Sequence, residues 1–180
     1  MSDKVDVIRE ALFRDDGGSI YAVLDGASVP NLLKELQAHE AEYICLFRGE
    51  LKPDMAEVAP YLIGLPPKGS FTEWLLGQGW GKHWGVFVEA HSDIRAMRQH
   101  FRGLLTVYDP TAKPMLFRFY DPRVLRVFLP TCTAEELNSL FGPLSAYFME
   151  DEDPAKMLRF RKRQDALDKK EINLEANVTR

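Results

Sequence analysis

The sequence has few cysteines and no long apolar run. Its 180 residues include two cysteines, Cys45 and Cys132, and neither lies in a CxxC pair or at a metal-ligand spacing. Two free thiols in apolar surroundings are the simplest interpretation, which suits a reducing compartment. No apolar stretch approaches the roughly 20 residues of a membrane-spanning helix, and the first residues lack the features of a signal peptide. We therefore expect a cytoplasmic protein that does not enter a membrane.

The sequence also lacks the local motifs of common enzyme classes. It contains no GxSxG elbow, no Walker loop and no GxGxxG after a predicted strand. Its four histidines, His39, His83, His91 and His100, include no pair at the i, i+4 spacing of a helical metal site. We therefore expect no metal, no cofactor and no catalytic activity. A nucleophilic cysteine activated by a histidine stays open as an alternative, although neither thiol has a local signature.

Positive charge is scarce over most of the chain. The net charge is −4, but residues 154–180 contain eight basic and four acidic residues, which leaves −8 on residues 1–153. A nucleic-acid-binding domain usually has a basic surface, so we do not expect nucleic acid as a partner. A basic tail could instead dock the chain on another protein assembly.

The hydrophobic pattern predicts one α/β (α+β) domain. Strands are expected at 21–24, 43–47, 61–65, 84–89, 104–108 and 115–120. Helices are expected between them, the clearest of which has Ile94, Met97 and Phe101 as its buried stripe. This order predicts a mixed sheet of about five to seven strands flanked by helices. The domain should span residues 1–153, with residues 154–180 as a charged tail that is helical or disordered.

All three tryptophans lie within eleven residues. Trp74, Trp80 and Trp84 are interleaved with glycines. Such aromatic residues commonly anchor protein interfaces, so we take the three as candidate partner-binding residues. The alternative is that they pack in the core, with glycines supplying positive φ angles.

The string Phe-Arg-Phe-Tyr-Asp-Pro-Arg at residues 117–123 places charged groups beside aromatic ones. On the strand expected at 115–120, Arg118 and Tyr120 share one face, and a partly buried arginine needs acidic partners. Asp25 and Asp121 are the acids we expect, with Asp121 also capping a helix that begins at Pro122. Arg118, Tyr120, Asp121 and Arg123 are therefore candidates for partner binding, or for a purely structural ion pair.

Arg95, Arg98 and Arg102 recur at i, i+3 and i+7, opposite the buried stripe of their helix. A solvated helix face is the simpler interpretation. Docking of an acidic partner is the functional alternative.

Several segments, taken in order, resemble one protein family. They are the residues 21–27, 59–65, 71–76, 79–81, 94–105 and 117–125. The combination of Ala-Pro-Tyr-Leu and Arg-Phe-Tyr-Asp-Pro, in this order and spacing, resembles the Tap or Tec adaptors of bacterial type VI secretion, catalogued as domain of unknown function 4123. The resemblance extends from about residue 20 to residue 148.

The resemblance implies a binding function. Members of that family are cytoplasmic chaperones that bind a toxic effector, often through its N-terminal part, and help load it onto a VgrG or PAAR spike protein. The family has no catalytic residues that can be placed on this sequence. The segment from about residue 151 lies outside the resemblance and is expected to help select the effector. A cysteine-dependent enzyme and a docking subunit of another assembly remain the alternatives.

Overall fold

The computed structural model describes residues 2–14 and 17–175 of the chain. The main sheet consists of β1 (Ser19–Asp25), β2 (Tyr43–Cys45), β3 (Pro60–Leu65), β4 (Gly85–Ala90), β7 (Leu144–Glu150), β8 (Lys156–Arg163) and β9 (Ala166–Asn173). The helices are α1 (Ser2–Leu12), α2 (Leu32–Ala38), α3 (Pro53–Val58), α4 (Ser70–Gly79), α5 (Ile94–Leu104), α6 (Pro122–Phe128) and α7 (Ala134–Phe141). A separate hairpin pairs β5 (Thr106–Tyr108) with β6 (Pro114–Leu116). None of the described helices combines the length and apolar character that crossing a membrane requires.

The seven-stranded sheet has the order β2-β3-β1-β4-β7-β8-β9. The α/β composition and the expected strand number are confirmed. Neighbouring strands are antiparallel at every pairing, including β1 with both β3 and β4, so the expected mixture of parallel and antiparallel pairs is wrong. Long connections that contain helices bring the chain back antiparallel to strands that are distant in the sequence but adjacent in the sheet. The order of elements along the sequence does not reveal this direction.

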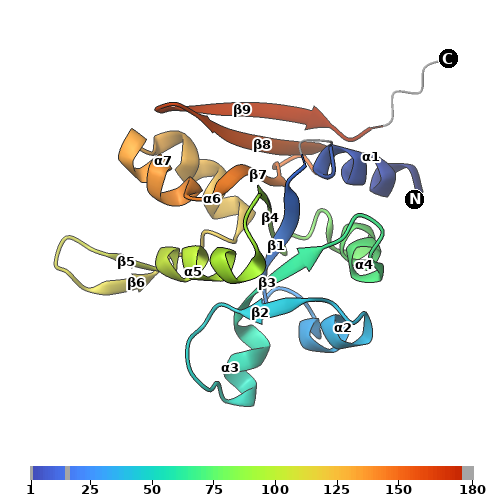
Figure 1. Ribbon diagram of the computed structural model, residues 1–180, viewed down its shortest axis with the longest axis horizontal. Coiled ribbons are helices and arrows are strands. Elements are labelled where there is room, and N and C mark those ends of the chain that lie inside the picture. Colours follow the sequence, from blue (N-terminus) through green and yellow to red (C-terminus); the bar gives the residue numbers. More distant parts are fainter. Residues whose placement is uncertain (1, 15–16, 176–180) are drawn as a thin grey trace.

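Alternating side chains of the central strand divide the core into two layers. Tyr21 and Val23 of β1 face one layer, whereas Ala22 and Leu24 face the other. Helices α5, α6 and α7 cover the first layer, and α1, α2 and α4 cover the second (Figure 1). Burying a large apolar side chain in such a layer stabilises the fold by about 1.5–3 kcal/mol.

Residues 154–175 are the largest correction to the sequence prediction, and residues 176–180 of the predicted tail lie outside the described residues. Strands β8 and β9 form a hairpin, and β8 pairs with β7, so most of this segment extends the main sheet instead of forming a helical or disordered tail. The boundary predicted at residue 153 therefore lies inside the sheet. Leu158 and Phe160 are buried in one core layer and Met157 is buried in the other, and this burial outweighs the polar composition.

The strand predicted at 115–120 ends at Leu116, and the Phe117 N–H, which donates to the Leu105 carbonyl, makes the last hydrogen bond of the hairpin. The expected face shared by Arg118 and Tyr120 on a strand is therefore wrong. Two helix predictions at the same side of the sheet are confirmed, because Ile94, Met97 and Phe101 are buried and Asp121 caps α6. Thr133 and Glu136 form a capping box on α7.

Candidate functional site

The β5–β6 hairpin exposes apolar side chains on both of its faces. Val107 pairs with Met115 in register, so these two share one face, and Tyr108 and Leu116 project from the other. Their exposed fractions are 39% for Val107, 48% for Met115, 68% for Tyr108 and 53% for Leu116. The hairpin leaves the body of the fold beside α5 (Figure 1). Its apolar side chains are therefore accessible to another molecule.

A groove lies at the base of this hairpin, with a volume of about 370 Å³. We call it the hairpin groove. It is lined by Gly103, Leu104, Thr106, Val107, Phe117, Phe128, Glu135, Glu136, Ser139 and Leu140. Its apolar lining consists of Leu104, Val107, Phe117, Phe128 and Leu140, and Glu135 and Glu136 at the start of α7 supply negative charge. Val124 and Val127 of α6 add further exposed apolar area.

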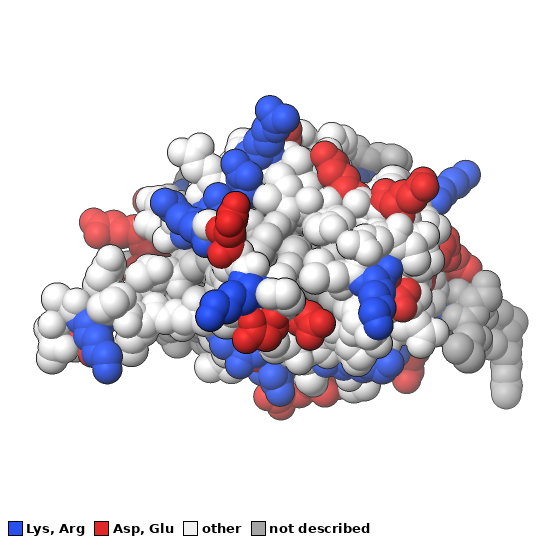
Figure 2. All heavy atoms as spheres, turned by 90° about the horizontal axis from the view of Figure 1, so that it is seen from below, with Lys and Arg blue, Asp and Glu red and all other residues white. Residues whose placement is uncertain are grey.

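The charged side chains of the hairpin are confined to its turn, which contains Asp109 and Lys113. Figure 2 shows the projecting end of the hairpin, on the left, as mostly uncharged, whereas acidic and basic side chains are interspersed over the rest of that face. Soluble domains rarely leave a contiguous apolar patch uncovered unless it binds a partner. The hairpin and its groove are therefore the candidate site for binding a protein.

An ion-pair network holds the chain between the hairpin and α6. The Arg118 Nη2 atom donates to Asp25 Oδ2 at 2.6 Å and lies 3.5 Å from Asp121 Oδ2. Arg123 donates twice to Asp121, with Nε at 3.0 Å from Oδ1 and Nη2 at 2.8 Å from Oδ2. The prediction that Asp25 and Asp121 are the acidic partners of Arg118 is confirmed. The network connects the end of β1 to the start of α6 and so fixes the base of the hairpin.

Burial and hydrogen bonding act in opposite directions on this network. Burial favours the neutral form of Asp121, but hydrogen bonds from the side chain and backbone of Arg123 outweigh it and lower the pKa of Asp121. Tyr120 is buried against Phe119. Arg118 and Arg123 stay 44% and 53% exposed. Of these four predicted residues, Tyr120 and Asp121 thus face their own chain, and a role in partner binding stays a prediction for the two arginines.

The tryptophans pack mainly against their own chain. Trp84 is only 7% exposed and stacks on Trp74 with 5.4 Å between ring centroids. Trp80 is partly buried, and its indole N–H donates to the Pro154 carbonyl. A Cβ added at Gly79 would lie 2.7 Å from the Trp84 ring, so that glycine is needed for the close approach of the ring. The core interpretation therefore fits Trp84, and partner binding by Trp74 and Trp80 stays untested.

The three arginines of α5 differ in their surroundings. Arg95 is exposed, whereas Arg98 is partly buried. The Arg102 guanidinium donates to the carbonyls of Leu46, Cys45 and Phe47 at 2.9–3.1 Å. Arg102 therefore fastens α5 to the segment after β2, a role that the helical spacing did not predict.

Comparison with protein families gives one match. Residues 20–139 match the family model described as "Domain of unknown function (DUF4123)". The chain belongs to the DUF4123 family. Searches of the curated proteins and of the solved structures gave no match. The DUF4123 region includes α5, the hairpin, α6 and most of α7, so the hairpin groove lies within it, except for Leu140. The β8–β9 hairpin lies outside the match.

The chemistry of the DUF4123 chain does not favour an activated thiol at Cys132. Burial, together with the carboxylate of Glu136, raises the pKa of the Cys132 thiol. A nucleophilic cysteine requires the opposite shift, because the thiolate is the reactive form. Among the described residues, no group of three or more His, Cys, Asp and Glu side chains is placed to hold a metal ion.

His100 should make the DUF4123 fold sensitive to acid. Burial lowers the pKa of His100 below its ordinary value of 6.5, and its Nε2 atom lies 3.1 Å from the Leu140 carbonyl oxygen. The unfolded chain then binds a proton more readily than the folded chain, so this histidine lowers stability as the pH falls below about 6.5. A single group contributes a slope of at most about 1.4 kcal/mol per pH unit.

We expect His100→Gln to reduce the decrease in the free energy of unfolding between pH 7 and pH 5, measured by urea denaturation at each pH. His91, which is exposed on the loop before α5, provides the matched control. His91→Gln should leave the pH dependence as in the wild type. Parallel pH profiles for the wild type and His100→Gln would contradict the assignment.

Sequence reasoning missed the hairpin groove as a site. Val107, Tyr108, Met115 and Leu116 fit the expected strand pattern, and an apolar strand is ordinarily interpreted as buried. The polar, proline-containing turn at residues 109–114 predicts a hairpin from the sequence, and the structure confirms it. Whether such a hairpin packs on the core or projects from it depends on tertiary contacts.

Proposed function

We propose that this chain is a non-catalytic adaptor of type VI secretion. In this proposal it binds an effector protein in the cytoplasm and promotes the loading of that effector onto a VgrG or PAAR spike protein. Membership of the DUF4123 family supports the proposal, since that family is associated with type VI adaptors. The observation that carries it is the exposed apolar hairpin with its groove, which suits the capture of a protein segment.

The physical requirements of such an adaptor agree with this site. A chaperone has to bind apolar side chains that its client has not yet buried, and a groove already held open costs little ordering entropy on binding. The Asp25–Arg118–Asp121 network fixes the base of the hairpin in advance. A helix or strand of the effector can then cover Val107, Phe117 and Phe128.

Isolation of the tagged full-length chain from its native bacterial cytoplasm tests the proposal. We expect one effector protein to co-purify in a stoichiometric complex, together with or followed by a spike protein, as identified by mass spectrometry. Deletion of the gene for this chain should abolish delivery of that effector and leave unrelated effectors unaffected. If a folded and abundant bait recovers neither protein, the adaptor proposal is wrong.

A further inference from the structure

Four arginines surround one depression on the side of α5 that faces away from the core. The depression has a volume of about 580 Å³ and is lined by Arg48, Asp93, Arg95, Ala96, Arg98, Gln99 and Arg102. We call these seven residues the arginine patch. Four guanidinium groups against one carboxylate give the patch a local charge of +3, although the whole chain has a net charge of −4.

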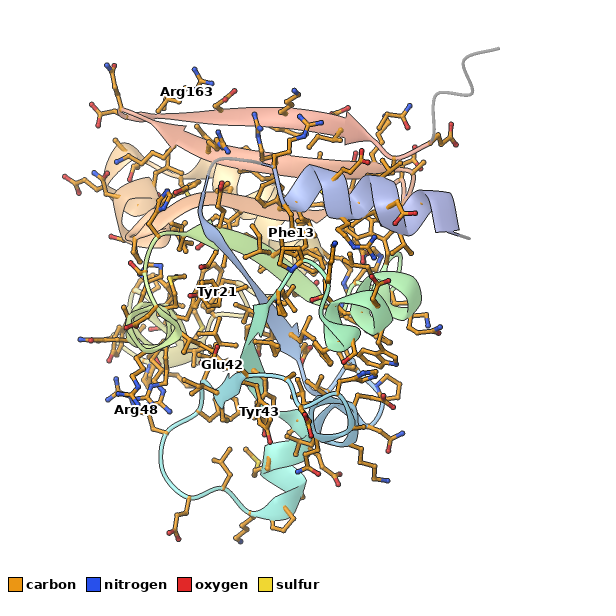
Figure 3. All side chains as sticks on the ribbon, turned by 45° about the vertical axis from the view of Figure 1, so that its right-hand side comes forward. Phe13, Tyr21, Glu42, Tyr43, Arg48 and Arg163 are labelled. Carbon is orange, nitrogen blue, oxygen red and sulfur yellow. The ribbon has the colours of Figure 1, made fainter. Side chains whose placement is uncertain are left out.

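Arg102 holds together the two parts of the chain that form the patch, α5 and the segment after β2. Its hydrogen bonds to the carbonyls of residues 45–47 hold the segment after β2 against α5, and this places Arg48 beside the helix. Figure 3 shows Arg48 next to α5, which is seen nearly end-on at the lower left, whereas Arg163 lies at the opposite side of the molecule. Carbonyl oxygens satisfy hydrogen bonds but carry no net charge, so the positive charge of Arg102 is not neutralised.

The patch is electrostatically unfavourable in the free chain. Within the described part of the chain, no carboxylate forms an ion pair with Arg48, Arg95 or Arg98. Asp93 is occupied as the cap of α5, since its side chain accepts a hydrogen bond from the Ala96 N–H. Burial, followed by repulsion from Arg98 and Arg48, lowers the pKa of Arg102, which shows that the charges are close enough to repel one another. A ligand with negative charge would remove this repulsion.

We infer that the arginine patch binds an acidic segment of a partner protein, through several Asp or Glu carboxylates. The inference rests on the proposed function, since it takes the effector or the spike protein to supply that segment. Arginine forms bidentate pairs with carboxylates, which contribute affinity and also fix the position of the bound segment on the patch. From Arg95 to Arg102 the helix rises about 10 Å, a distance that three or four residues of an extended segment span. The acidic remainder of the chain repels the long backbone of a nucleic acid, so a short acidic peptide is the better match.

Fluorescence anisotropy with a labelled twelve-residue peptide of alternating Glu and Ala, at low ionic strength, measures this interaction. We expect Arg95→Glu combined with Arg98→Glu to weaken peptide binding at least tenfold. The matched control is Arg163→Glu combined with Lys170→Glu on the β8–β9 hairpin, which changes the net charge equally, and it should change affinity less than twofold. A peptide with Lys in place of Glu should not bind.

The inference fails if the acidic peptide does not bind or if the two double variants weaken binding equally, because the effect is then one of net charge alone. It also fails if a short DNA duplex or vesicles that contain phosphatidylserine bind more tightly than the peptide and lose that binding in Arg95→Glu/Arg98→Glu. Co-purification of the effector and spike in the same variant separates the two proposals. Unchanged recovery of both proteins overturns only the arginine patch, whereas absence of partners from the wild type overturns the adaptor function.

Discussion

Phe160→Ala should lower the free energy of unfolding by about 3–5 kcal/mol, because it empties a fully buried site in the core. Phe160 lies on β8, is 0% exposed and belongs to the core layer that α5, α6 and α7 cover. It stands opposite the fully buried Tyr147 of β7 in the register of the sheet. The expected loss would lower the melting temperature by roughly 6–20 °C for a chain of this size.

Urea denaturation followed by circular dichroism measures the effect, with Tyr108→Ala as the control. Tyr108 is also aromatic and lies on a strand, but it is 68% exposed, so its removal should change stability by no more than about 0.5 kcal/mol. A loss of less than 1 kcal/mol for Phe160→Ala would mean that the C-terminal hairpin does not pack on the core. It would then behave as the separable tail that the sequence composition suggested.

The features that the sequence predicted well depend on local chemistry. The stripe Ile94, Met97 and Phe101 follows from helical periodicity, and the cap at Asp121 follows from a side chain that satisfies a free backbone N–H group. The pairing of Arg118 with Asp25 spans 93 positions of the sequence, and it could be predicted because a charge among apolar residues requires an acid nearby.

The features that the sequence did not predict depend on contacts between distant segments. Strands β8 and β9 contain many charged residues, and only pairing with β7 shows that Leu158 and Phe160 face the core. Arg102 has the spacing of a solvated helical face, yet its partners are neutral carbonyls at the end of β2 and in the segment after it. Neutral acceptors cannot be recognised in a charge pattern, so the sequence grouped Arg95, Arg98 and Arg102 but did not place Arg48 beside them.

Removal of the apolar side chains from the hairpin should abolish most of the partner binding. We expect Tyr108→Ser combined with Leu116→Ser to reduce the affinity for the effector by about 30- to 1000-fold, since each anchor of an interface contributes roughly 1–2 kcal/mol or more. Both side chains are more than half exposed, so the double variant should fold normally. Titration of the co-purified effector against the immobilised chain measures the affinity.

Met55→Ser combined with Val58→Ser is the matched control, because these apolar residues are 44% and 43% exposed on α3, outside the hairpin and its groove. The control should bind within about twofold of the wild type. Equal losses in both variants would show that exposed apolar area in general, and not the hairpin, determines binding. Unchanged binding in the hairpin variant would instead exclude the face of the hairpin that carries Tyr108 and Leu116 as the effector site, and the arginine patch would then be the next surface to test, because its charge acts independently of the apolar hairpin.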